Sequence, residues 1–399
     1  MKTVWVAACL ALASAGVLTQ DWQGVIAQLR DGKSGRRIDA VRQLNEAGYA
    51  AAAEYVAPLV TDPDDNVQFA AIDAELTFFL VEPIGERRTL SLTGSSRSRA
   101  QEAFDAGPLV RAAAAAPAVL IDQLITATAD RNPRIRFDAL HALGVIGEPP
   151  LTDDAARRLM VGLQQNDAVM RAATARVLGR LRAAAAGDAL IASLNDSNDL
   201  VQQFATESLG LLRNDRAVQA LTDRVNYYGK GDKANIALSA LARIAYVSSR
   251  DLFRARLSDA DPMARRAAVE GVGRLRDRAS IELARAIAKS DPSSDVRLAG
   301  LFALDRLGEP QLAGIALSLG QPVLGAQARD YLLEAGPSAA PAIVEALAKA
   351  TAPAARAELV HLLGYLGGAA QIRALEPLVK DPDPRVARAA TTAIARRRR

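Results

Sequence analysis

The sequence of 399 residues has a single cysteine, Cys9, and only two histidines. Cys9 lies in a segment that we expect to be removed, so the mature chain has no disulfide framework and no thiolate chemistry. Aromatic residues make up only 4%, which argues against the stacking platforms that bind single-stranded nucleic acid. The formal net charge of +4 is too small for this length to imply a domain-wide basic field.

Motifs for catalysis and cofactor binding are also missing. The sequence has no HExxH, GxSxG, CxxC or phosphate-binding frame, and Gly229-Lys230-Gly231 lacks the flanking residues of a phosphate loop. His141 and His361 lie in distant parts of the sequence, so we expect no metal ion shared between them. We therefore expect no catalytic residue, no metal site, no cofactor and no enzymatic activity.

The chain does contain a sequence repeat, which is clearest in residues 130–144. When Arg136 is taken as the reference position, equivalent positions recur mostly at steps of 31 or 32 residues, with one step each of 28, 35 and 68. They are Arg37, Gln68, Arg136, Arg171, Gln202, Ala234, Arg265, Arg297, Gly325, Arg356 and Ala387. A period of this size predicts a solenoid of two-helix units.

Two columns of residues support a helix after each reference position. Small residues stand three positions later in all units but that of Leu359, and aliphatic residues stand seven positions later in all units but that of Glu75. Spacings of three and four place both columns on one helix face. An upstream apolar pair such as Leu190/Leu194 predicts a first helix, and an Asp six positions before the reference predicts the turn between the helices.

This pattern resembles the HEAT repeat, in particular the short bacterial type named after phycobilisome lyases, over nearly all of residues 22–399. The resemblance implies an all-α fold, a right-handed α-solenoid of the armadillo type with about eleven repeats. It also implies a ladder in which the turn Asp of the units pairs with the reference Arg. The residues of this ladder would be Asp130, Arg136, Arg171, Asp196, Asp259, Arg265, Asp291 and Arg297.

The chain divides by composition into four parts. Residues 1–20 resemble a signal peptide, with Lys2, an apolar core and the small-x-small site Ala13-Ser14-Ala15. Repeats follow at 21–80, an irregular Ser/Arg-rich insertion or degenerate repeat at 81–108, and the main array at 109–399. We expect a periplasmic or secreted monomer without a transmembrane segment after cleavage. The alternative is an uncleaved helix of a cytoplasmic protein.

Positions five and nine of the second helices point away from the packed columns and are the candidate protein-binding surface. The residues that we select are Arg176, Arg180, Arg243, Arg274, Arg306 and Tyr365. On stacked repeats the arginines form a stripe suited to an acidic peptide or polyanion. The alternative is that they are ordinary helix C-terminal charges and local pairs such as Glu270–Arg274.

Three functions from different classes remain open. The first is an exported, non-enzymatic scaffold or adaptor that binds a protein or peptide on its concave face. The second is a lyase accessory or another enzyme-associated protein, which the family resemblance implies and the missing thiol argues against. The third is a polyanion or nucleic-acid binder, against which the low charge and scarce aromatics argue. We choose the first.

Overall fold

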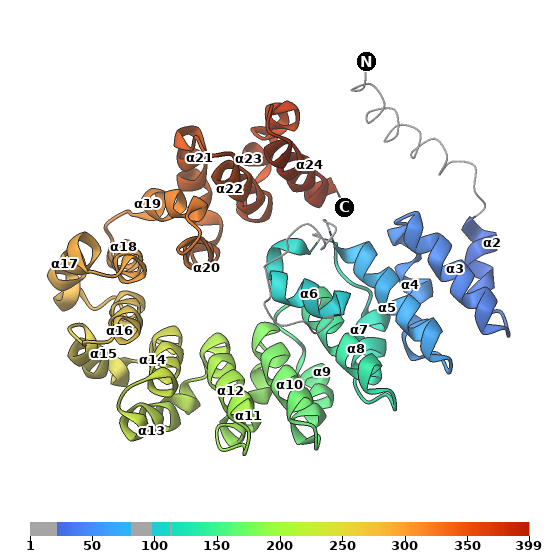
Figure 1. Ribbon diagram of the computed structural model, residues 1–399, viewed down its shortest axis with the longest axis horizontal. Coiled ribbons are helices and arrows are strands. Elements are labelled where there is room, and N and C mark those ends of the chain that lie inside the picture. The colour runs from blue at the N-terminus through green and yellow to red at the C-terminus, as the bar shows by residue number, and fades with distance from the viewer. Residues whose placement is uncertain (1–21, 81–97, 112–113, 399) are drawn as a thin grey trace. The chain divides into compact units, whose positions relative to one another are not determined.

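The computed structural model describes residues 22–80, 98–111 and 114–398 (Figure 1). The expected signal peptide therefore lies outside the described residues, as does most of the insertion at 81–108. The described chain is helical, with one isolated antiparallel bridge between Leu80 and Arg111. None of its helices is long and apolar enough to span a membrane. It divides into two compact units between Gly147 and Glu148, and each unit is described by itself.

The N-terminal unit contains three helix pairs and one additional helix. The pairs are α2 (Trp22–Gln28) with α3 (Ser34–Glu46), α4 (Ala53–Val56) and η2 (Ala57–Thr61) with α5 (Asp65–Phe79), and α7 (Ala118–Ala127) with α8 (Pro133–Ile146). The additional helix, α6 (Arg99–Ala106), lies within the expected insertion and packs against α8. Part of the insertion is thus a packed helix.

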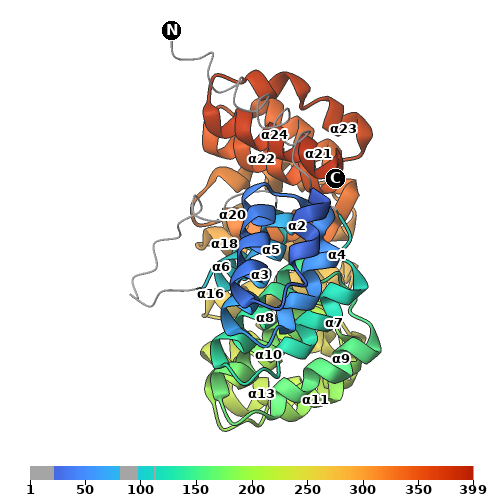
Figure 2. The same ribbon diagram turned by 90° about the vertical axis from the view of Figure 1, so that its right-hand side faces the viewer.

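The C-terminal unit contains eight successive pairs in residues 148–398, and Figure 2 shows the last of them, α21 to α24, packed side by side. The first helices are α9 (Asp153–Leu159), α11 (Gly187–Ser193), α13 (Val218–Tyr228), α15 (Arg250–Arg256), α17 (Ile281–Ser290), α19 (Leu312–Leu317), α21 (Ala340–Lys349) and α23 (Ala369–Arg373). The second helices are α10 (Ala168–Arg180), α12 (Asp199–Leu212), α14 (Asp232–Ile244), α16 (Pro262–Arg274), α18 (Ser294–Leu307), α20 (Gly325–Ala335), α22 (Pro353–Leu366) and α24 (Pro384–Arg398). The predicted α-solenoid is confirmed.

Short polar residues cap several of the second helices. The side chain of Asp167 accepts a hydrogen bond from the backbone N–H of Val169, and Asp261 does the same for Met263. These caps satisfy N–H groups that have no partner inside the helix. The Asp that was predicted six positions before the reference lies two residues before the capping residue. In α12 this is Asp196, which accepts a hydrogen bond from the backbone N–H of the capping residue Asn198.

Glycine sets how closely consecutive second helices approach. A β-carbon added to Gly273 of α16 would lie 2.7 Å from Cα of Ala303 on α18, which no real side chain tolerates. The same register recurs at Gly179 against Ser208, Gly210 against Ala240 and Gly364 against Ala393. In each pair, glycine eight positions after the reference faces Ala or Ser six positions after the next reference. Absence of a side chain permits this backbone contact.

The register fails on both sides of α20. Asp305 of α18 and Tyr331 of α20 stand where the other pairs have glycine and a small residue, and so do Leu333 of α20 and Leu362 of α22. Such bulky pairs cannot bring two helix backbones into contact. Accordingly, α20 packs mainly on α19 and the 3₁₀ turn Ser318–Gly320 rather than closely on α18 or α22. In Figure 1 it lies on the inner side of the row of second helices.

Candidate functional site

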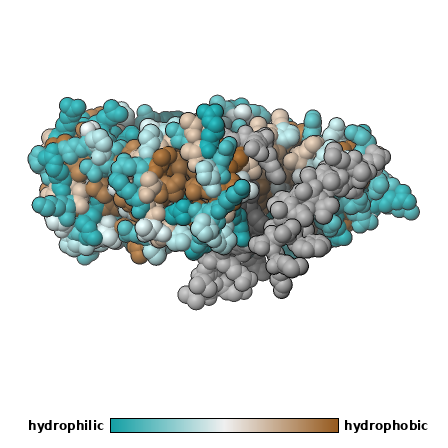
Figure 3. Space-filling model, turned by 90° about the horizontal axis from the view of Figure 1, so that it is seen from above, coloured by the Kyte–Doolittle hydropathy of each residue, from teal (hydrophilic) through white to brown (hydrophobic). Residues whose placement is uncertain are grey.

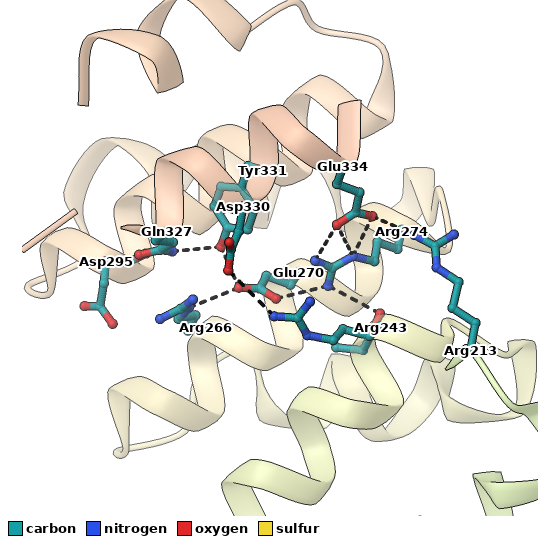
Figure 4. Close-up of polar contacts among 11 residues, drawn as sticks. Arg213, Arg243, Arg266, Glu270, Arg274, Asp295, Gln327, Asp330, Tyr331 and Glu334 are labelled. Carbon is teal, nitrogen blue, oxygen red and sulfur yellow. Dashed lines mark hydrogen bonds and ion pairs between the residues drawn. The ribbon is translucent and has the colours of Figure 1, made fainter. Parts of the chain in front are cut away.

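The inner side of the C-terminal unit holds a cluster of charged side chains between α12, α14, α16 and α20 (Figure 4). Three arginines from consecutive repeats face α20: Arg213 at the end of α12, Arg243 on α14 and Arg274 on α16. We call these three residues the arginine row. Arg213 lies just past its helix with φ +52°, a left-handed end that closes a helix.

Glu270 of α16 is the buried centre of the cluster. It accepts from Arg274 at 3.0 Å, from Arg266 at 3.0 Å and from the Tyr331 hydroxyl at 2.5 Å. Burial alone raises the pKa of Glu270, but the charges of Arg274 and Arg266, with the hydrogen bond from Tyr331, outweigh it and lower the pKa to about 2. Glu270 is therefore ionised, as a buried charge with several donors is expected to be.

Glu334 of α20 closes the cluster on the other side. Arg274 donates to it through Nε at 3.0 Å and Nη2 at 2.9 Å, and Arg213 donates to it at 3.1 Å. Burial raises the pKa of Glu334, but the hydrogen bond from Arg274 and the charges of Arg274, Arg213 and Arg306 lower it overall. The Arg274 side chain, only 4% exposed, is thus held between two carboxylates.

Three further residues fix α20 on this surface. Asp330 lies 4.0 Å from Arg243. Tyr331 stacks on Phe302 of α18, with ring centroids 4.3 Å apart, and burial raises the pKa of its hydroxyl well above the usual value. Gln327 donates to the backbone carbonyl of Asp295 at 2.9 Å and to the Tyr331 hydroxyl. One face of α20 therefore contacts α14, α16 and α18 through side chains.

The structure distributes the predicted binding residues over several places. It brings Arg243 and Arg274 together against α20, and the charge of Arg306 acts on Glu334 of that helix. Arg176 and Arg180 lie on α10, with Arg176 over the Phe204 ring at 5.4 Å. Tyr365 lies on α22, where Arg396 stands over its ring.

One premise of that prediction is wrong. Position five of the second helices was expected to point away from the packed columns, yet His141, Glu270 and Phe302 are all buried there. Arg274, predicted on an open stripe, is also buried. The reason is that α20 covers these positions on α16 and α18, while in the N-terminal unit His141 packs against Phe104 and Phe137.

The predicted ladder takes a definite form. Arg171 donates two hydrogen bonds to Asp196 of the next repeat, at 2.8 and 2.9 Å, and Arg265 does the same to Asp291. Arg136 and Arg297 donate instead to the backbone carbonyls of Asp130 and Asp291 of their own turns. Asp259 accepts from Arg256. Paired hydrogen bonds of this kind thus join adjacent repeats directly, and they recur at Arg37–Asp62 and Arg356–Asp381.

Residues that sequence reasoning missed are Arg213, Arg266, Asp330, Tyr331 and Glu334. Arg213, Arg266 and Tyr331 lie outside the selected columns. Asp330 and Glu334 stand at positions five and nine of their repeat, but their partners lie 60 or more residues away in the sequence. The available signal was the 28-residue step to Gly325, together with the loss of small residues at Asp305 and Tyr331.

The fold and this geometry define an α-solenoid of two-helix repeats. Comparison with family models matches HEAT repeats at residues 156–227 and 232–305. These two stretches are therefore HEAT repeats, as the residue columns predicted. A comparison with curated proteins found no match.

Several solved structures resemble the chain at low identity. An engineered protein is 18% identical, with 96% of this chain and 100% of that chain covered and a TM-score of 0.42. The complex of CpcE and CpcF of phycocyanin lyase from Nostoc sp. PCC7120 is 16% identical, with 77% and 98% covered and a TM-score of 0.37. Human deoxyhypusine hydroxylase is 20% identical, with 69% and 95% covered and a TM-score of 0.30. None of these similarities bears on function.

Proposed function

We propose that this chain is an exported, non-enzymatic scaffold that binds an acidic segment of a partner protein on the inner side of its C-terminal unit. The observation that carries this proposal is the charge of the cluster. Its contacts involve four arginines, at 213, 243, 266 and 274, but three carboxylates, at 270, 330 and 334. The arginines therefore exceed the carboxylates by one.

The excess charge is accessible to a partner. The side chains of Arg213 and Arg243 are 58% and 40% exposed, whereas Arg266 and Arg274 are used inside the cluster. Guanidinium groups bind carboxylates through paired hydrogen bonds, so these two residues favour an acidic protein segment. On the face drawn in Figure 3, hydrophobic side chains lie in groups separated by hydrophilic ones. Export rests on the composition of residues 1–20.

Capture from a cell-envelope extract tests the function. The bait is the chain without residues 1–20, compared with the double variant Arg213→Glu and Arg243→Glu. The matched control is Arg157→Glu, an exposed arginine on the first helix α9. We expect a partner that the native bait and the control retain and the double variant loses. A partner that all three baits retain equally contradicts this site, and capture of no partner contradicts the binding function.

A further inference from the structure

Helix α20 holds a different position from the other second helices of the C-terminal unit. Its neighbours contact one another through backbone at glycine, as Gly273 does with Ala303 and Gly364 with Ala393. On its inner face α20 is instead held to α14 and α16 by hydrogen bonds and ion pairs between side chains. Contacts of this kind can be remade by another helix that presents the same groups.

The groups that α20 presents form a simple pattern. Asp330 and Glu334 stand four residues apart, so both lie on one face of the helix, one turn apart. They meet arginines of three consecutive repeats, since Asp330 lies near Arg243 and Glu334 accepts from Arg213 and Arg274. Tyr331, between them, donates to Glu270. The arginine row and Glu270 therefore bind a helix that carries two carboxylates at i and i+4 and a tyrosine beside the first of them.

The boundaries of α20 allow it to move as a separate element. The helix ends at Ala335 and is followed by Gly336, whose φ of +68° favours glycine. Before it, Gln321, Pro322 and Val323 are all exposed and belong to no helix. The segment before α20 is thus exposed and offers little packing that would resist a change in the position of the helix.

We propose that the arginine row is a binding site for an acidic helix, that α20 is its resident occupant, and that a partner helix with carboxylates at i and i+4 takes its place. This inference rests on the proposed function and specifies the partner's chemistry. Binding then requires α20 to leave the arginine row, so the native chain binds such a helix more weakly than a chain whose α20 has lost its two carboxylates.

A peptide made from the chain itself tests this exchange. The probe is a fluorescein-labelled peptide of residues 322–338, and the full chain is titrated into it while anisotropy is measured. Asp330→Asn with Glu334→Gln in the chain weakens the resident helix, and we expect the peptide to bind that variant at least tenfold more tightly than the native chain. Adding Arg213→Glu and Arg243→Glu should abolish the gain.

The matched control is the same peptide carrying the Asn and Gln replacements, which should bind at least tenfold more weakly. Equal affinity of the native and variant chains for the acidic peptide overturns the exchange. Equal affinity of the variant chain for the acidic peptide and for its Asn/Gln counterpart also overturns it. If the variant chain fails to fold, hydrogen exchange of the native chain decides. Backbone amides of α20 should exchange at least tenfold faster than those of α18 and α22, and equal protection overturns the proposal.

The two proposals fail separately. An envelope partner that depends on Arg213 and Arg243, together with a peptide that does not bind, leaves the scaffold function standing and removes the acidic-helix exchange. Peptide binding with no envelope partner retains the exchange surface and contradicts the scaffold function in that compartment.

Discussion

Neutralising Glu270 is the substitution whose consequence can be worked furthest from the structure. Glu270→Gln keeps the shape of the side chain and removes the charge that Arg266 and Arg274 share. The environment lowers the pKa of Glu270 from 4.5 to about 2, which corresponds to roughly 3 kcal/mol of stabilisation when the group is ionised. Removing one partner of a buried charge cluster typically costs about 3–5 kcal/mol. We therefore expect the free energy of unfolding to fall by about 3 kcal/mol at pH 7.

The pH dependence has a definite sign. Because the folded-state pKa of Glu270 lies below its unfolded value, its contribution is present above about pH 4.5 and is lost as the pH falls through about 2. The difference between native chain and variant should therefore stay constant from pH 7 to 5 and shrink below pH 4.5. Urea unfolding, followed by circular dichroism at several pH values, measures it.

The matched control is Glu282→Gln on α17, a carboxylate that is 80% exposed and paired with Arg285. An exposed pair contributes less than about 1 kcal/mol, so this variant should unfold close to the native midpoint. The reasoning is refuted if Glu270→Gln also stays within about 0.5 kcal/mol of the native chain at pH 7.

Three further substitutions test other parts of the fold, each by urea unfolding. Gly273→Leu should lower the free energy of unfolding by about 2 kcal/mol or more, because its β-carbon would clash with the backbone of Ala303; a neutral result contradicts the glycine register. Arg265→Lys should cost about 1–2 kcal/mol, since lysine cannot form both hydrogen bonds to Asp291, and an unchanged midpoint contradicts the pairing. Glu75 is fully buried, its carboxylate lacks a hydrogen-bond partner among the described residues, and burial raises its pKa. Glu75→Leu should therefore raise the free energy of unfolding of the N-terminal unit by about 1–3 kcal/mol at pH 7. Its gain should diminish towards pH 4, where protonation removes the cost of burying the charge, and a destabilised variant contradicts this.

The sequence predicted what repeats and missed what occurs once. Small and aliphatic columns identified the second helices, because every repeat packs on its neighbours by the same contacts. The same columns could not place α20, since the contact between Arg274 and Glu334 spans 60 residues and has no counterpart in the other repeats. Tyr331 shows the difference most clearly. At a position that holds alanine or serine in the closely packed pairs, it both prevents close packing on α18 and supplies the hydroxyl that Glu270 binds.

The candidate site was predicted only in part, for a related physical reason. The arginines of the second helices were visible, and the structure brings Arg243 and Arg274 into one cluster. Their partners were not visible, because an acidic residue on a distant helix looks like any solvated charge until the fold brings it close. Asp330 and Glu334 stand at positions five and nine of their repeat, and the 28-residue step with the bulky residues around it was the signal that this repeat packs differently.

The contact between Arg274 and Glu334 tests the central claim most directly, because it exists only if α20 lies on the arginine row. The measurement is a double-mutant cycle of unfolding free energies with Arg274→Met, Glu334→Gln and both together. Residues in one hydrogen-bonded network couple by about 0.5–3 kcal/mol, and the account predicts at least about 1 kcal/mol for this buried pair. Additivity within about 0.3 kcal/mol would contradict it and place α20 away from the arginines.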